Sequence, residues 1–460
     1  MKLNNDQKRL LYSGAVWALY ETITAGFLIV FALALGASNT VVGVLGALPY
    51  IAMLVMEIPG AKLVEFFRRK TVYVTATGLS RLSWLLILLT PYLFKEYTLW
   101  FVGGFFFLMR CLDYLADPAW TSWAADLVPD RMRGVFWGQR GMLVGFAGMI
   151  ASLLAGSYLD LFPKESMLGF ATLFGVGILF GLWSTRIMSR TTEPVYRDHD
   201  HHRLREFFQI DGQFRRYCWI MVAYNFAVMI ASPFFTVYML KDLGLSYTMF
   251  VVVGAIATVS RILAHPHFGY VSDRMGDRPV ALLCMLGTAI VPLAYIFITR
   301  ETLWLIVPVQ ILSGVVWAGT ELATWNLLLD LTHRTKRAMQ VAEYNLLNSI
   351  PNIVAPVIGG LIADNVAIIL TGIPLIFAIA TVLRAGTAFL LLRIRETRVK
   401  AEHPLSEVFV QSLTVHPFHG METAIKVVVK RIRKEFEHVR APYPVNKRIV
   451  RFESPKLYKP

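Results

Sequence analysis

Ten ionisable side chains fall deep within long apolar stretches of this chain. They are Glu21, Arg81, Arg110, Asp113, Asp117, Arg140, Arg261, Glu321, Glu343 and Arg384. A charged side chain in hydrocarbon costs at least about 2.5 kcal/mol even on a lenient scale, so each one needs a partner, a proton or water. Five are acidic and five are basic, which favours mutual ion pairing. Carboxylates in such surroundings can also bind and release protons.

The stretch that contains Arg110 carries the densest group of these charges. Arg110, Asp113 and Asp117 are spaced three and four residues apart, which places them on one face of a helix. Pro118 follows directly and frees a backbone carbonyl in the preceding turn. Free backbone groups at membrane depth are tolerated where they line a cavity or are buried in protein. The pattern predicts a helix whose polar face lines an internal pathway.

A repeat relates the two halves of the sequence. Asp126-Leu-Val-Pro-Asp-Arg-Met-Arg133 corresponds to Asp330-Leu-Thr-His-Arg-Thr-Lys-Arg337, 204 residues later. The same offset pairs Asp117 with Glu321 and Glu21 with Asn225. We therefore expect a central pathway lined by Glu21, Arg81, Arg110, Asp113, Asp117, Arg140, Asn225 and Glu321. The alternative is that these charges only pair to hold helices together, and this alternative is favoured for Arg261, Glu343 and Arg384.

The elements that must position these residues are membrane-spanning helices. Of the 460 residues 56% are hydrophobic and 17% charged, with a mean hydropathy of +0.53, and the apolar blocks are about twenty residues or longer, the length of a membrane span. We count about twelve spans, which predicts an all-α membrane protein. We find no nucleotide-binding loop, nucleophile motif or convincing metal set, so we expect neither an enzyme nor a cofactor or bound metal.

The positive charge is distributed as in a membrane protein rather than a nucleic-acid-binding protein. The net charge is +14, and the basic residues gather in alternate loops. Because cytoplasmic loops carry the excess of Lys and Arg, both termini are expected in the cytoplasm. The membrane expected is the plasma membrane, which would be the inner membrane of a bacterium. No nucleic-acid partner is expected.

Two charged segments between apolar stretches identify a family resemblance. The first is Gly269-Tyr-Val-Ser-Asp273-Arg274-Met-Gly276-Asp277-Arg278, and a degenerate copy runs from Ala61 to Lys70. This spacing resembles the signature loop of the major facilitator superfamily of secondary transporters. The resemblance implies gating loops that contain Glu65, Arg69, Lys70, Gly269, Asp273, Arg274, Gly276 and Arg278. We expect the preceding helix to end near Gly269.

The resemblance also implies a domain organisation. Two pseudo-symmetric six-helix halves are expected at residues 1–190 and 217–394, joined by a cytoplasmic linker at 191–216. A basic tail follows at 395–460, in which residues 421–439 show an amphipathic helical pattern. Such a helix suits an anionic cytoplasmic lipid surface, and docking on a partner protein is the alternative.

The function expected from these features is secondary active transport of a small polar or anionic solute by alternating access, coupled to protons. Arg110 resembles the arginine of a fourth-span motif implicated in proton coupling in this family, although Asp113 and Tyr114 replace its usual Gln-Gly. An uncoupled facilitator is one alternative. Another is a sensor or scaffold that does not transport and acts through its basic tail. We expect a monomer.

Overall fold

The computed structural model describes residues 3–129, 132–164, 166–194, 212–333, 337–366, 371–396 and 407. Within them, twelve helical segments are long and apolar enough to cross a membrane. This confirms the predicted all-α architecture of about twelve spans. The amphipathic helix predicted at 421–439 and most of the predicted linker (195–211) lie outside the described residues.

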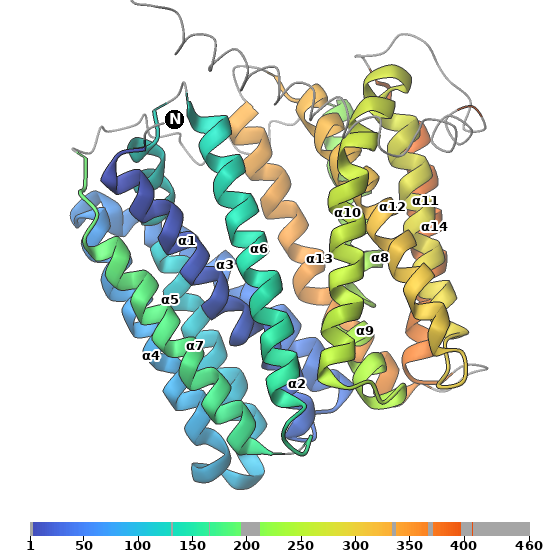
Figure 1. Cartoon of the computed structure of the whole chain (residues 1–460). Coiled ribbons are helices and arrows are strands. Elements are labelled where there is room, and N and C mark those ends of the chain that lie inside the picture. Colours follow the sequence, from blue (N-terminus) through green and yellow to red (C-terminus); the bar gives the residue numbers. More distant parts are fainter. Residues whose placement is uncertain are drawn as a thin grey trace, which may run out of the picture.

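The first six spans form one group of helices in Figure 1. The first span consists of α1 (Asn5–Ile23) and α2 (Leu28–Ala34), separated by a 3-10 turn. A capping box between Asn4 and Gln7 satisfies backbone N–H groups at the start of α1. The remaining helices of this group are α3 (Asn39–Phe66), α4 (Arg69–Leu93), α5 (Thr98–Leu127), α6 (Arg133–Leu159) and α7 (Met167–Ser189).

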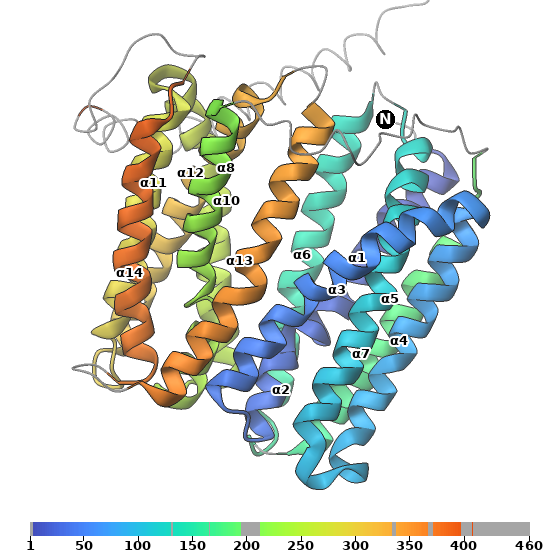
Figure 2. The same cartoon turned by 180° about the vertical axis from the view of Figure 1, so that it is seen from behind.

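The last six spans form the second group, and its first span is also interrupted. There α8 (Gly212–Met229) is followed by the short α9 (Phe234–Val237) and a π-helical turn. The other helices are α10 (Tyr247–Met275), α11 (Asp277–Ile296), α12 (Ile306–Leu331), α13 (Arg337–Asn365) and α14 (Ile373–Leu390). The two groups meet where α3 packs on α13 and α6 on α10, as the front and back views show (Figures 1 and 2).

The charged loop that follows the eighth span is shorter than predicted. The expectation that the helix ends near Gly269 is wrong, because α10 runs through this residue to Met275. The helix ends at Gly276, whose φ of +95° suits glycine because it has no Cβ. The helix α3 likewise extends to Phe66. A polar helical turn can extend past the apolar part of its span, since its charged side chains then lie in water.

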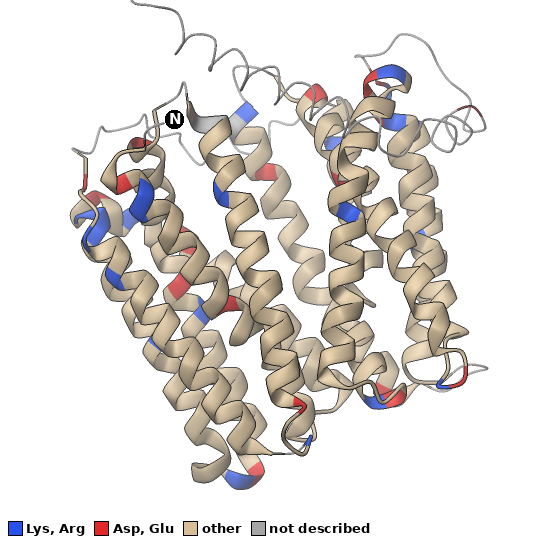
Figure 3. Cartoon of the chain, viewed as in Figure 1, with Lys and Arg blue, Asp and Glu red and all other residues tan. Residues whose placement is uncertain are grey.

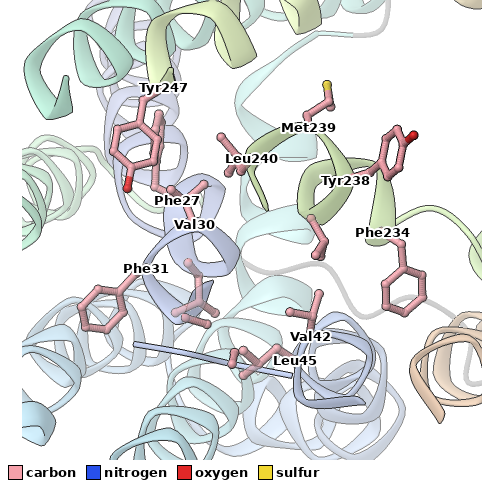
Figure 4. Close-up of a cluster of buried hydrophobic side chains, with 14 of the residues drawn as sticks. Phe27, Val30, Phe31, Val42, Leu45, Phe234, Tyr238, Met239, Leu240 and Tyr247 are labelled. Carbon is pink, nitrogen blue, oxygen red and sulfur yellow. The ribbon is translucent and has the colours of Figure 1, made fainter. Parts of the chain in front are cut away.

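An apolar cluster joins the two groups at the end of the molecule opposite the amino terminus. Figure 4 shows side chains from the first group (Phe27, Val30, Phe31, Val42 and Leu45) beside side chains from the second (Phe234, Tyr238, Met239, Leu240 and Tyr247). Backbones also meet here. A Cβ at Gly43 of α3 would collide with the carbonyl of Pro356 in α13, and one at Gly360 would lie 2.6 Å from the carbonyl oxygen of Asn39. Small residues permit this close approach.

Two aspartates seal the same end in a symmetric way. Asp364, in the last turn of α13, accepts hydrogen bonds from the backbone N–H of Asn39 (3.2 Å) and Thr40 (2.7 Å) at the start of α3. Asp160, just after α6, accepts from the backbone N–H of Tyr247 and Thr248 (2.8 Å each) at the start of α10. A carboxylate is favoured here by unpaired N–H groups and by the helix dipole.

We call these two contacts the aspartate clamp. Asp160 and Asp364 are 204 residues apart, the offset of the sequence repeat, so each group of helices donates one aspartate and one helix start. Lysines add a second set of contacts. Lys241 donates to the carbonyl of Ala37 (2.8 Å), and Lys164 donates to the carbonyl of Leu245 (3.2 Å).

The clamp is expected to be insensitive to pH in the physiological range. Burial raises the pKa of Asp160, but the hydrogen bonds from Thr248 and Tyr247 outweigh it and hold the pKa below its ordinary value. The stability that Asp160 contributes is therefore present above the ordinary carboxyl pKa and lost only as the pH falls through the lowered one. We expect Asp160→Asn to lower the unfolding temperature equally at pH 5 and pH 8. The difference should shrink only below about pH 4. A loss that is large at pH 8 and absent at pH 5 would contradict this assignment.

Candidate functional site

A polar cavity of about 490 Å³ lies inside the first group of helices. It is lined by Ser13, Trp17, Glu21, Tyr73, Thr77, Arg81, Arg110, Asp113, Tyr114, Ala116, Asp117, Trp120, Arg140 and Ser184. Six of the eight predicted pathway residues are among them: Glu21, Arg81, Arg110, Asp113, Asp117 and Arg140. Figure 3 shows charges along the middle of this group, away from the charged residues at the helix ends.

Four of these residues form a continuous chain of alternating charge. Glu21 Oε1 of α1 lies 2.6 Å from an Nη atom of Arg110 on α5. Arg110 also lies 3.7 Å from Asp113, one turn along the same helix. The other oxygen of Asp113 lies 2.5 Å from Arg81 of α4. We call Glu21, Arg110, Asp113 and Arg81 the charge chain. Two positive and two negative charges make it neutral when all four are ionised.

Aromatic residues fix the buried end of the charge chain. Arg81 is only 3% exposed, and its guanidinium lies 4.3 Å from the centre of the Tyr20 ring. The Tyr20 hydroxyl accepts a hydrogen bond from the indole N–H of Trp84 (2.8 Å), and both aromatic side chains are fully buried. A cation over an aromatic face is stabilised by the ring quadrupole. The sequence analysis missed Tyr20 and Trp84, because buried aromatics in a span look like ordinary core residues.

Glu21 has one oxygen with no partner. Its Oε1 bonds to Arg110, whereas Oε2 is buried and has no hydrogen-bond partner among the described residues. A buried acceptor without a donor is costly. A proton bound at Oε2 would cancel the negative charge and turn this acceptor into an O–H donor.

Arg140 and Asp117 line the cavity but stay outside the charge chain. Among the described residues, neither forms an ion pair or hydrogen bond. The guanidinium of Arg140 lies 4.8 Å from the ring centre of Trp120 and 5.6 Å from that of Trp137. Asp117 is exposed toward the cavity. Glu57 of α3, an acid that the sequence analysis did not single out, is near enough to interact electrostatically with Asp117.

The two remaining pathway residues lie elsewhere, in the second group. Glu321 of α12 bonds to Arg261 of α10 (2.9 Å) and lies 3.5 Å from His265. Asn225 of α8 donates to Asn348 of α13 (2.5 Å). Neither residue is among those that line the cavity. The structure brings six of the predicted residues together and places Glu321 and Asn225 in separate contacts.

The first predicted gating loop is held by its own half. Arg69 is 2% exposed and lies 2.6 Å from Asp126 and 3.6 Å from Glu193. Lys70 donates to the carbonyl of Thr191 (3.1 Å). These contacts tie the start of α4 to the ends of α5 and α7, at the end of the molecule that carries the amino terminus (Figure 1).

The second gating loop is held in a corresponding way. Glu396, after α14, accepts hydrogen bonds from the backbone N–H groups of Asp277 (2.8 Å) and Arg278 (2.9 Å). Arg274 lies over the Tyr270 ring at 4.2 Å. Burial raises the pKa of Glu396 above its ordinary value. Glu193 and Glu396 were not predicted, and they are 203 residues apart, one residue short of the repeat offset.

Comparisons with known proteins agree on one family. A family model described as the Major Facilitator Superfamily matches residues 10–227 and 217–441. A curated relative, described as an uncharacterized MFS-type transporter, YitZ, from Bacillus subtilis (strain 168), is 27% identical over 139 residues, which are 30% of this chain and 83% of the relative.

Solved structures show the same fold at low sequence identity. A bacterial homologue of the iron transporter ferroportin, in an inward-facing state, superposes with a TM-score of 0.68 and 12% identity over 85% of this chain and 99% of that one. The xylose transporter XylE from E. coli, in an inward-open conformation, has a TM-score of 0.64 and 15% identity over 88% of this chain and 98% of that one.

Proposed function

Because the chain belongs to the Major Facilitator Superfamily, and so is a secondary transporter in a membrane, we propose that it moves a small polar or anionic solute by alternating access, coupled to protons. The observation that carries the proposal is the charge chain, with its unpartnered Glu21 oxygen, in the wall of a polar cavity. The division into halves at 1–190 and 217–394 stays a prediction, as do cytoplasmic termini.

The conformational state proposed for this structure is inward-facing. The aspartate clamp and the apolar cluster close the end opposite the amino terminus. If the amino terminus is cytoplasmic, as the basic loops predict, the closed end is the outer one. The ferroportin homologue and the xylose transporter superpose in inward-facing and inward-open states, respectively. In the opposite state the two groups of helices rock relative to each other, the clamp opens, and the gating loops come together.

Proton binding at Glu21 supplies the coupling. The Glu21 carboxylate takes up a proton and becomes a neutral acid, which weakens its bond to Arg110. The charge chain then changes from neutral to one net positive charge, and Arg110 is left with Asp113 alone. A cavity that gains a positive charge binds an anionic group more tightly, and by linkage the bound anion raises proton affinity. Proton and solute would therefore bind together, which favours symport.

The test is solute accumulation in liposomes that contain the full-length protein. With an inwardly directed proton gradient, we expect the wild type to accumulate a transported solute at least tenfold above the level without the gradient. Glu21→Gln keeps the shape of the side chain but cannot release a proton, so it should lose accumulation and retain exchange of labelled for unlabelled solute. Glu301→Gln, in an exposed loop, is the matched control. Full gradient-driven accumulation by Glu21→Gln would refute the coupling role.

The two alternatives give different results in the same liposomes. An uncoupled facilitator would equilibrate solute at a rate that ignores the gradient, in wild type and variant alike. A sensor or scaffold would show no flux, and removal of the residues after Lys400 would abolish partner binding. For a transporter we expect flux to survive that truncation.

A further inference from the structure

We propose that the cavity binds a small zwitterionic solute, whose acidic group contacts Arg140 and whose cationic group contacts Asp117. This inference rests on the proposed function, because it narrows the class of solute that the cavity accepts. It follows from the two charges in the cavity wall that the protein itself does not pair.

Arg140 presents an unused set of donors to the cavity. A guanidinium has five N–H groups and no acceptor, and among the described residues none of those of Arg140 is hydrogen-bonded. Its Nε is also buried without a partner. The guanidinium carbon lies over the indoles of Trp120 and Trp137, and the Nη atoms, unlike the buried Nε, are left for a ligand. Guanidinium edges match carboxylates with two parallel hydrogen bonds, so the complementary group is an anion.

Asp117 is the opposite pole. Its carboxylate lies in the wall of the same cavity, is exposed, and accepts no hydrogen bond from any described residue. Asp113 and Glu57 both lie within electrostatic reach of Asp117, so neighbouring negative charges reinforce this pole. Two carboxylates without a cation repel each other, and a ligand ammonium group would relieve this repulsion.

The two poles do not form an ion pair with each other in this arrangement. Trp120 follows Asp117 by three residues on α5, so its indole lies about one turn along the same helix, near 5 Å of rise, and Arg140 stacks on that indole. Arg140 also packs against α1, where a Cβ at Gly14 would lie 2.8 Å from the Arg140 Nε. The guanidinium therefore contacts both Trp120 and Gly14.

The other charged residues of the cavity pair with one another, so Arg140 and Asp117 are the charges that remain to recognise a solute. The charge chain is complete and neutral without Arg140 and Asp117. A zwitterion that bridges the two poles adds no net charge to a cavity in a low-dielectric surrounding. A solute with a single charge would pair with either Arg140 or Asp117 and leave the other side chain without a counter-ion. The same arrangement also disfavours uncharged sugars, which would leave both charges without a counter-ion.

The test measures ligand-induced thermal stabilisation of the purified full-length protein in detergent, with no proton gradient. The zwitterionic probes are glycine, leucine, β-alanine, 4-aminobutyrate and glycylglycine, which differ in size and charge separation. N-acetylleucine keeps only the negative charge, and leucinamide keeps only the positive one. We expect at least one zwitterion to raise the unfolding temperature in a saturable way. The singly charged derivative of each effective probe should need at least a tenfold higher concentration.

Variants assign the poles separately. Arg140→Gln should bind an effective zwitterion and its amide equally, whereas Asp117→Asn should bind the zwitterion and its N-acetyl derivative equally. Arg140→Lys keeps the positive charge but loses the planar guanidinium that forms two parallel hydrogen bonds. This variant replaces Arg140→Gln in the test if Arg140→Gln does not fold. The inference is overturned if no zwitterion stabilises the wild type, if singly charged probes bind as well, or if both variants keep the wild-type preference. Binding is measured here without a proton gradient. If the wild type prefers zwitterions but shows no proton coupling in the liposomes, only the proposed function is refuted.

Discussion

Replacing Asp160 and Asp364 together by asparagine is expected to open the closed end of the transporter in a large fraction of molecules. Each carboxylate accepts two backbone hydrogen bonds from the opposite group of helices, and these contacts must break when that end opens. Hydrogen bonds to a charged group contribute about 1.5–3 kcal/mol each. A combined loss of about 3 kcal/mol would shift the equilibrium between closed and open by roughly a hundredfold.

The shift can be measured by distances between spin labels across this end. Glu96, between α4 and α5, and Glu301, between α11 and α12, are exposed positions suited to introduced cysteines. The native Cys111, Cys218 and Cys284 are buried, which favours selective labelling. We expect a longer distance in the double variant and an intermediate distribution in each single variant.

A matched control separates clamp opening from the general effect of losing a hydrogen-bonded aspartate. Asp6 accepts hydrogen bonds from the backbone and side chain of Thr192, within one group of helices. Asp6→Asn should leave the distance across the closed end unchanged. The clamp would lose its assigned role if the double variant kept the wild-type distance distribution.

The second large effect is expected at Asp113. This carboxylate is the counter-ion of the buried Arg81 and also contacts Arg110. Asp113→Asn would leave a buried guanidinium without its closest negative charge, which costs about 3–5 kcal/mol of folding free energy. Asp117→Asn is the matched substitution one turn later on α5. Because Asp117 has no partner among the described residues, its replacement should change stability by about 0.5 kcal/mol or less.

Thermal unfolding of both variants under identical detergent conditions checks this contrast. Asp113→Asn should unfold at a clearly lower temperature than the wild type, and Asp117→Asn close to it. Equal losses in the two variants would mean that the charge chain does not organise the first group of helices.

The polar face of α5 illustrates what the sequence could predict. The spacing of Arg110, Asp113 and Asp117 placed them on one side of a helix, and the structure puts all three in one cavity wall. The number of spans and the all-α class could be predicted from the length of the apolar blocks, because a helix must have that length to cross a bilayer. The sequence could not predict which of these charged residues pair with each other, because the pairing depends on how α1, α4 and α5 pack.

The positions of Glu321 and Asn225 show what the repeat argument leaves open. A fixed offset relates chain positions, but it does not fix which neighbour each side chain meets. Glu321 pairs with Arg261 of α10, and Asn225 pairs with Asn348 of α13. Each residue therefore has a partner within the second group of helices. The aspartate clamp was not predicted from the sequence for another reason. Asp160 and Asp364 obey the repeat offset, but their partners are backbone N–H groups, which have no sequence signature.

The most direct test of the account is the effect of pH on the distance between labels at positions 96 and 301, since it needs no knowledge of the solute. If proton binding at Glu21 drives alternating access, the distance distribution of the wild type must differ between a sample at low pH and one at high pH. Glu21→Gln should show one distribution at both pH values. A wild type that ignores pH, or a Glu21→Gln variant with the full wild-type shift, would contradict the claim that this carboxylate couples protons to transport.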